Sequence, residues 1–185
     1  MARISIEIKL PANYRSKRLY DSLKIAMANQ NNCIFCQMQA GTIPYHQVWE
    51  DDSHFAFLSI FPNTLGFTVV ATKNHFGSYA FSQSDAVVSG LVIATKKVAQ
   101  LLDKHFEDVS RCGMFFEGFG VDHLHSKLFP MHGTGNLKDW EMRETEVNTA
   151  YFDQYPGYLS SNNSERADDV LLASLASAIR KSATE

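Results

Sequence analysis

Residues 121–130 of this 185-residue chain read Val-Asp-His-Leu-His-Ser-Lys-Leu-Phe-Pro, and they carry its most informative pattern. Successive side chains of a β-strand point to opposite faces, so a strand here places His123, His125 and Lys127 on one face. The opposite face then carries Leu124, Ser126 and Leu128, and the two leucines suit a buried core face. Three ionisable groups on one face pack a core poorly. The pattern therefore favours an anion site or a metal site.

Further strands are predicted on the N-terminal side of this stretch. Residues Val48–Thr72 predict two strands, with Phe61–Gly66 as the turn between them. Strands joined so closely are most simply an antiparallel hairpin. Cys112–Phe119 and Val121–Phe129 predict two more strands, and they are separated by glycines.

Helices are predicted around and between these strands. Apolar residues recur every three to four positions across Ser84–Phe106, which predicts a long helix that Ser84 can cap. Ser16–Gln30 predicts a helix before the strands, and Arg166–Arg180 predicts a final amphipathic one. Strands that dominate the middle with helices set apart are typical of the α+β class. The apolar stripe of the final helix is predicted to comprise Val170, Leu171, Leu175 and Ile179.

Composition excludes several classes of protein. Apolar residues make up 45% and charged residues 20%, which excludes disorder for most of the chain. A net charge of −3 argues against a nucleic-acid polymer as partner but not against a small nucleotide. No apolar run is long enough to span a membrane, and the first twenty residues do not resemble a signal peptide. We therefore expect a cytoplasmic protein without membrane association.

Two other motifs carry chemically active side chains. Cys33-Ile34-Phe35-Cys36 pairs two of the three cysteines, and His75 follows Lys73-Asn74. A lone Cys-x-x-Cys is often two small buried side chains, and it can also be a redox dithiol or half of a metal site. Taken one at a time, these motifs leave the three alternatives open.

Taken together, the motifs resemble the histidine triad (HIT) superfamily of nucleotide hydrolases and transferases. The resemblance covers about 100 residues, in order and with matching spacing. It implies an antiparallel β-sheet with a long helix on one side. It also implies a helical extension at 1–32, a HIT domain at 33–130, and an extension at 131–185 that ends in a helix. The matching segments are Cys33–Cys36, Gly41–Pro44, Phe57–Pro62, Gly66–His75 and His123–Pro130.

The resemblance implies a structural zinc ion. Two thiolates and two imidazoles are the closed tetrahedral set expected of structural zinc, so the metal is not expected to act in catalysis. The redox alternative lacks the strand-to-helix context and the small, turn-forming pair between the cysteines. The implied ligands are Cys33, Cys36, His75 and His123.

The resemblance also implies a catalytic histidine and a nucleotide substrate. His125 stands at the position of the nucleophile, which attacks the α-phosphorus and forms a nucleotidyl-histidine intermediate. The implied substrate is a dinucleoside polyphosphate or another nucleoside phosphoryl compound. Family members are typically homodimers that share a continuous sheet, so we expect one here. The implied nucleobase pocket comprises Ile34, Phe35, Met38 and Phe57, and Ser59 stands at the ribose position.

The chain departs from the family pattern at several positions. Lys127 replaces the third histidine; it keeps a positive charge for phosphate but suits proton transfer near neutral pH poorly. Ser59 replaces an acidic or amide residue, and Phe67 replaces a histidine. Glu117 is expected to be a solvated charge at a loop edge, since an inward carboxylate would repel phosphate. His132 and Thr134 either supply what is missing at position 127 or form a turn.

Three function classes follow from these departures. The leading hypothesis is a nucleotidyl hydrolase or transferase. The second is a nucleotide-binding protein without turnover, because three supporting positions have changed. The third is a protein-interaction scaffold in which the extension from Met131 provides the working surface.

Overall fold

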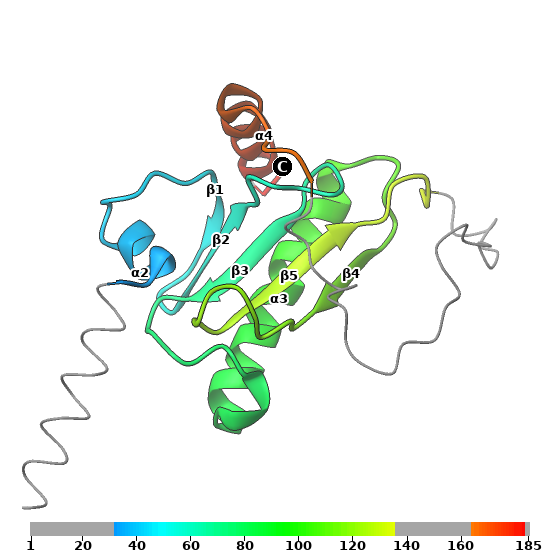
Figure 1. Ribbon diagram of the computed structural model, residues 1–185. Coiled ribbons are helices and arrows are strands. Elements are labelled where there is room, and N and C mark those ends of the chain that lie inside the picture. The colour runs from blue at the N-terminus through cyan, green and yellow to red at the C-terminus, as the bar shows by residue number, and fades with distance from the viewer. Residues whose placement is uncertain (1–31, 136–163, 184–185) are drawn as a thin grey trace, which may run out of the picture.

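The computed structural model describes residues 32–135 and 164–183, and its centre is a five-stranded antiparallel sheet (Figure 1). The strands lie in the order β1-β2-β3-β5-β4, so the last two strands exchange places relative to the chain. The fold class predicted from the sequence, α+β with an antiparallel sheet, is confirmed. The strands are β1 (Gln47–Glu50), β2 (His54–Leu58), β3 (Thr68–Thr72), β4 (Cys112–Phe115) and β5 (His125–Pro130).

The predicted hairpin between β2 and β3 is also confirmed. His54 pairs with Thr72 and Leu58 with Thr68, and every residue of both strands is buried. β5 lies against the other side of β3, with Ala71 opposite His125. Because β3 is hydrogen-bonded to a strand on each side, its register with β5 fixes where the β5 side chains lie.

Two helices cover one face of the sheet (Figure 1). The long predicted helix is present as α3 (Asp85–His105), and Ser84 is its N-cap residue, although its side chain makes no capping hydrogen bond. The final helix is α4 (Asp169–Lys181), capped by the Asp168 carboxylate, which accepts hydrogen bonds from two backbone N–H groups. Between the helices and the sheet lies the larger core cluster, which includes Leu91, Val98, Leu102, Leu124, Leu128 and Ile179.

The predicted apolar stripe of α4 is partly wrong. Val170 and Leu171 are 76% and 70% exposed, whereas Leu172 and Ala176 are buried with Ile179. One residue rotates a helix by about 100°, so the choice between Leu171 and Leu172 moves the stripe to a different face. The periodicity of a leucine-rich segment does not decide between them, and packing against α3 and β1 does.

The opposite face of the sheet carries a shorter helix, α2 (Ile34–Gln39), and a smaller core cluster. Phe55 and Phe57 of β2 and Val69 and Ala71 of β3 belong to this cluster, as the alternation of side chains requires. His125 and Lys127 lie on the same face, since their neighbours Leu124 and Leu128 belong to the cluster under α3. His125 and Lys127 are therefore on the α2 face, and His123, just before the strand, contacts the two cysteines of the α2 segment.

The last two strands are shorter than predicted. β4 ends at Phe115 and β5 begins at His125, so residues 116–124 form a loop. Gly118 and Gly120 adopt φ of 72° and 86°, a conformation that side-chain-bearing residues rarely adopt, and extended pairing stops there. His123 consequently precedes the strand.

The helix predicted at Ser16–Gln30 and most of the segment that follows Pro130 lie outside the described residues. Within residues 32–135 and 164–183, no helix combines the length and apolar character that crossing a bilayer requires.

Candidate functional site

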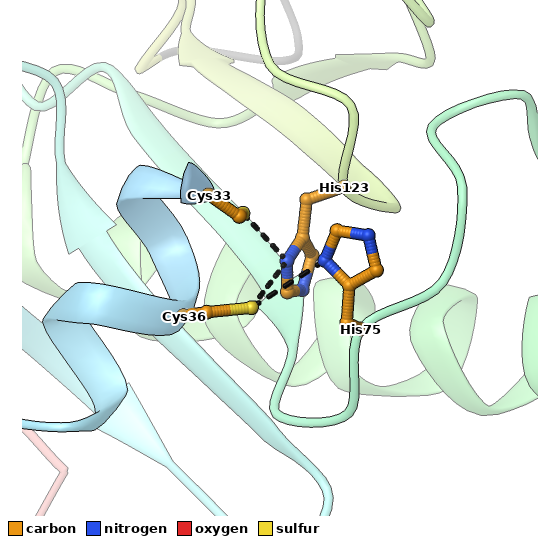
Figure 2. A group of neighbouring side chains, drawn as sticks. All are labelled: Cys33, Cys36, His75 and His123. Carbon is orange, nitrogen blue, oxygen red and sulfur yellow. Dashed lines mark hydrogen bonds between the residues drawn. The ribbon is translucent and has the colours of Figure 1, made fainter. Parts of the chain in front are cut away.

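Four side chains from separate parts of the chain converge beside α2 (Figure 2). Cys33 is the N-cap residue of α2 and Cys36 lies within the helix. His75 comes from the segment after β3, and His123 comes from the loop just before β5. One potential ligand atom from each lies within 4.8 Å of the other three. The structure therefore brings together all four residues that the resemblance implied as zinc ligands.

The spacing of these atoms fits a tetrahedral zinc ion. The Cys33 Sγ lies 3.3 Å from the His123 Nδ1, and the Cys36 Sγ lies 3.4 Å from the His75 Nδ1 and 3.7 Å from the His123 Nδ1. Zinc bonds of about 2.3 Å to sulfur and 2.0 to 2.1 Å to nitrogen place tetrahedral ligands about 3.5 Å apart. Both cysteines are free thiols.

The protonation chemistry of the cluster also fits a cation. The Nε2 of His123 donates to the Thr72 carbonyl at 2.7 Å, which leaves Nδ1 with its lone pair toward the two thiols. Burial lowers the pKa of His123 to about 4, so the ring is neutral. Burial and the adjacent Cys33 thiol raise the pKa of Cys36 to about 11. Forming the thiolate there without a cation is costly, and a bound metal removes that cost.

Next to this cluster lies a cavity of about 580 Å³ on the α2 face. Its apolar wall includes Phe35, whose ring meets the Phe57 and His125 rings edge to face at centroid distances of 5.2 and 5.3 Å. Such a wall with few polar groups is typical of sites for small organic ligands. All seven residues predicted as catalytic or substrate-binding line it: Ile34, Phe35, Met38, Phe57, Ser59, His125 and Lys127.

Sequence reasoning missed several residues of this cavity. Tyr45 and Phe119 line it from the segments flanking β1 and β5, and Arg166 and Asp169 line it from the start of α4. The resemblance ended at Pro130, so no motif linked the final helix to the site. The Arg166 guanidinium binds the Asp169 carboxylate at 2.9 Å, and the carboxylate also binds the His46 ring at 2.9 Å.

His125 is held in a single tautomer. Its Nδ1 lies 2.6 Å from the His123 carbonyl oxygen, which can only accept, so Nδ1 carries the proton. Nε2 is then the nitrogen with the free lone pair. Burial, together with the positive charge of Lys127, lowers the pKa of His125 below its ordinary value. A neutral imidazole with one nitrogen anchored and the other free can act as a nucleophile.

Lys127 forms a buried ion pair with Glu117. The two side chains are only 7% and 8% exposed, and the carboxylate binds the lysine Nζ. The expectation that Glu117 is a solvated charge is therefore wrong. The β4–β5 register brings the two residues together: Phe115, the last residue of β4, lies opposite Lys127, and Glu117 follows two residues later, at the start of the loop. That spacing was visible in the sequence, but only β4–β5 pairing gives it meaning.

The other uncertain positions have plain structural roles. His132 binds the Asp108 carboxylate and the Leu65 carbonyl, and Thr134 binds the Met131 carbonyl. The pair therefore forms a turn and supplies nothing at Lys127. The Ser59 hydroxyl accepts a hydrogen bond from the Phe61 N–H at 3.2 Å and keeps its own proton to donate.

Comparisons with known proteins agree with this architecture. A search against models of protein families gives no match. The chain is 31% identical over 134 residues to an uncharacterized 16.1 kDa HIT-like protein of Mycoplasma pneumoniae, covering 68% of this chain and 92% of that protein. It is 29% identical over 100 residues to the adenosine 5′-monophosphoramidase hnt1 of Schizosaccharomyces pombe, covering 54% and 74%.

A solved structure shares the fold. The zinc-bound histidine triad family protein of Mycobacterium smegmatis is 17% identical and matches with a TM-score of 0.59, covering 84% of this chain and 95% of that one. At that identity the likeness concerns the fold alone. The sequence relative from Mycoplasma, matched over nearly its whole length, carries the assignment. This chain belongs to the histidine triad family, with a lysine at the third position of the signature.

Proposed function

We propose that this protein is a nucleotidyl hydrolase or transferase that acts on a nucleoside phosphoryl compound through His125. One observation carries the proposal: His125 lines a largely apolar cavity as a neutral imidazole whose Nδ1 proton is held by the His123 carbonyl. The relatives of this chain include the adenosine 5′-monophosphoramidase hnt1, which supports a nucleoside 5′-phosphoryl group as the reacting unit.

The reaction follows from the free nitrogen of His125. The Nε2 lone pair attacks the α-phosphorus, the bond from phosphorus to the leaving group breaks, and the leaving group departs with the electron pair and takes up a proton. Water or another acceptor then attacks the same phosphorus, releases the imidazole and loses its proton to solvent. The positive charge of Lys127 lies on the same strand face and stabilises negative charge on the phosphoryl oxygens.

The apolar wall is suited to a nucleobase. Phe35 and Phe57 offer ring faces and edges at one side of the cavity, and Ile34 and Met38 extend that side along α2. Aromatic rings favour planar, apolar partners. Ser59 lies in the same cavity with a hydroxyl proton that can bind a ribose oxygen.

The cluster of cysteines and histidines supports the site by holding His123 in place. Cys33, Cys36, His75 and His123 would hold zinc, and the ion would supply a cross-link between α2 and the loop before β5. His123 belongs to both parts of the site, because its ring faces the thiols and its carbonyl accepts from His125. A fixed His123 backbone therefore keeps the His125 ring in the reactive tautomer.

A second candidate is a nucleotide-binding protein without turnover. The observation that favours it is the ion pair in which Glu117 neutralises Lys127, the cation beside His125. Loss of an available cation weakens stabilisation of the transferring phosphoryl group.

Covalent labelling distinguishes the two candidates. Wild-type protein, His125→Ala and the matched control His105→Ala, a histidine on α3, would be incubated with radiolabelled nucleoside phosphoramidates and dinucleoside polyphosphates. We expect acid-labile label on the wild type and the control, with release of mononucleotide, and none on His125→Ala. Nucleotide binding without label or release supports the binding protein. Absence of binding and label contradicts both candidates and supports the scaffold.

A further inference from the structure

The charges around the cavity are balanced in pairs. Lys127 and Arg166 are the two lysine or arginine side chains among the described lining residues, and each binds a carboxylate. Arg166 binds Asp169 at the cavity mouth, where both side chains are at least half exposed. Lys127 binds Glu117 in the interior, where both are more than nine-tenths buried. The two cations and two carboxylates sum to zero.

The interior pair has the larger effect on a ligand. Water screens the exposed pair at the mouth, whereas the buried pair is screened little. Glu117 does not itself line the cavity, so it acts on a ligand without touching it, by the negative charge that it sets beside Lys127. Phe115 lies 5.7 Å from the lysine Nζ, and the Phe67 ring packs against Phe115, so the pair sits against apolar side chains. A phosphoryl group beside His125 therefore lies near a lysine whose positive charge is already neutralised by the Glu117 carboxylate.

We propose that Glu117 is a specificity-determining residue that selects singly charged phosphoryl linkages over terminal, doubly charged phosphates. The inference rests on the proposed function, since it assigns a charge class to the phosphoryl group of that same site. Glu117 does not touch the ligand and is a positioning residue: its negative charge offsets the positive charge of Lys127. It sets how much positive charge the lysine offers to the cavity.

The charge count gives the selection its direction. A phosphorus joined to both a nucleoside and a leaving group carries one ionised oxygen. A nucleoside monophosphate carries nearly two negative charges above pH 7, because the second phosphate pKa is about 6. Lys127, paired with Glu117, can accommodate one negative charge on the phosphoryl group, but it stabilises a second negative charge little. The site therefore holds ester or amide substrates better than the monophosphate product, and product leaves readily.

The test measures affinity against ligand charge. Calorimetric titration at pH 8 would use adenosine, the methyl ester of adenosine 5′-monophosphate, and adenosine 5′-monophosphate, which differ by one charge each. We expect wild type to prefer the ester to the monophosphate. Glu117→Gln should raise affinity for the monophosphate about tenfold or more, raise that for the ester less, and leave adenosine unchanged. The gain should shrink in high salt.

A matched control removes the same charge elsewhere. Glu50 binds Lys73 at 2.9 Å, partly exposed, and neither residue lines the cavity. Glu50→Gln should leave all three affinities unchanged. A merely structural role for Glu117 would lower the three affinities together and leave their ratios as in wild type, and that result would overturn the inference.

A second pair of variants covers the case in which Glu117→Gln folds poorly, since it leaves a buried lysine without its partner. Lys127→Gln and the double variant Lys127→Gln/Glu117→Gln differ only at position 117. The double variant should bind the monophosphate about tenfold more tightly than Lys127→Gln does. Equal affinities would overturn the inference. If the adenosine series and the corresponding guanosine, cytidine and uridine series all fail to bind wild type, the proposed function itself fails.

Discussion

Two ends of the α2 face differ in how closely they follow the family pattern. The metal end comprises Cys33, Cys36, His75 and His123, and the reactive end comprises His125, Lys127 and Glu117. The metal end keeps all four positions of the pattern, and the structure brings their ligand atoms together. The reactive end keeps the histidine but replaces its partner with a buried ion pair. The family pattern is therefore complete at one end and altered at the other, along a single strand and the loop before it.

This difference has a physical cause. A tetrahedral metal site needs four donors at fixed distances, so one substitution removes a ligand and the folding free energy that it contributes. A phosphoryl site needs positive charge and hydrogen-bond donors, and several side chains can supply them. We therefore expect substitutions at the reactive end to leave the position of His123 unchanged.

The largest expected effect tests the reactive end alone. His125→Ala should remove turnover and covalent labelling entirely, because the Lys127 amine, the other side-chain nitrogen on this strand, is bound by the Glu117 carboxylate. Zinc content and melting temperature should stay close to wild type. Radiolabel retained on the protein and atomic absorption of the same sample provide the measurements. Turnover equal to wild type would reject His125 as the nucleophile.

The next effect concerns the cation. Lys127→Ala should lower turnover by roughly 10² to 10³, the usual cost of one contact to developing charge, and it also leaves the Glu117 carboxylate buried without its cation. Lys127→His restores the family triad and should keep or raise the rate, since imidazole titrates near neutral pH. Steady-state kinetics with one nucleotide substrate compares the three proteins. Unchanged turnover in Lys127→Ala would remove the lysine from the mechanism.

A smaller effect on turnover, with a large one on stability, is expected at the metal end. Freshly purified protein should contain about one zinc per chain, and a chelator should lower its melting temperature. His75→Ala should lower the melting temperature clearly and change kcat little, because the ring of His75 approaches Cys36 and not the cavity. Protein that is fully stable and free of zinc would contradict the metal assignment.

Local patterns predicted the local structure, and the family resemblance predicted the meeting of Cys33, Cys36, His75 and His123, but contacts outside the family pattern were missed. The hairpin, the long helix and the shared face of His125 and Lys127 follow from patterns within a few residues. The ion pair between Glu117 and Lys127 depends on the pairing of β4 with β5. Whether Arg166 lines the cavity depends on where α4 packs against the sheet. Neither leaves a periodic signal. The homodimer and the domain limits stay predictions, and light scattering of the purified chain tests the former.

The smallest expected effect comes from the opposite face of the same strand. Ser126 lies between His125 and Lys127 but points toward α3, where its hydroxyl is 2.6 Å from the Thr95 hydroxyl. Thr95 donates to the Leu91 carbonyl, so Ser126 is the donor of the pair.

Thr95→Val should leave the Ser126 hydroxyl buried without its acceptor and lower the free energy of unfolding by about 1 to 3 kcal/mol. The conservative variant Thr95→Ser keeps an oxygen at that place and should lose less. Chemical denaturation measures the loss, and the same samples give turnover and zinc content. Because both ends of the α2 face are held by their own contacts, neither turnover nor zinc should change by more than about twofold. A large loss of turnover with normal zinc would show that the reactive end depends on the α3 face for its geometry, whereas the metal end does not.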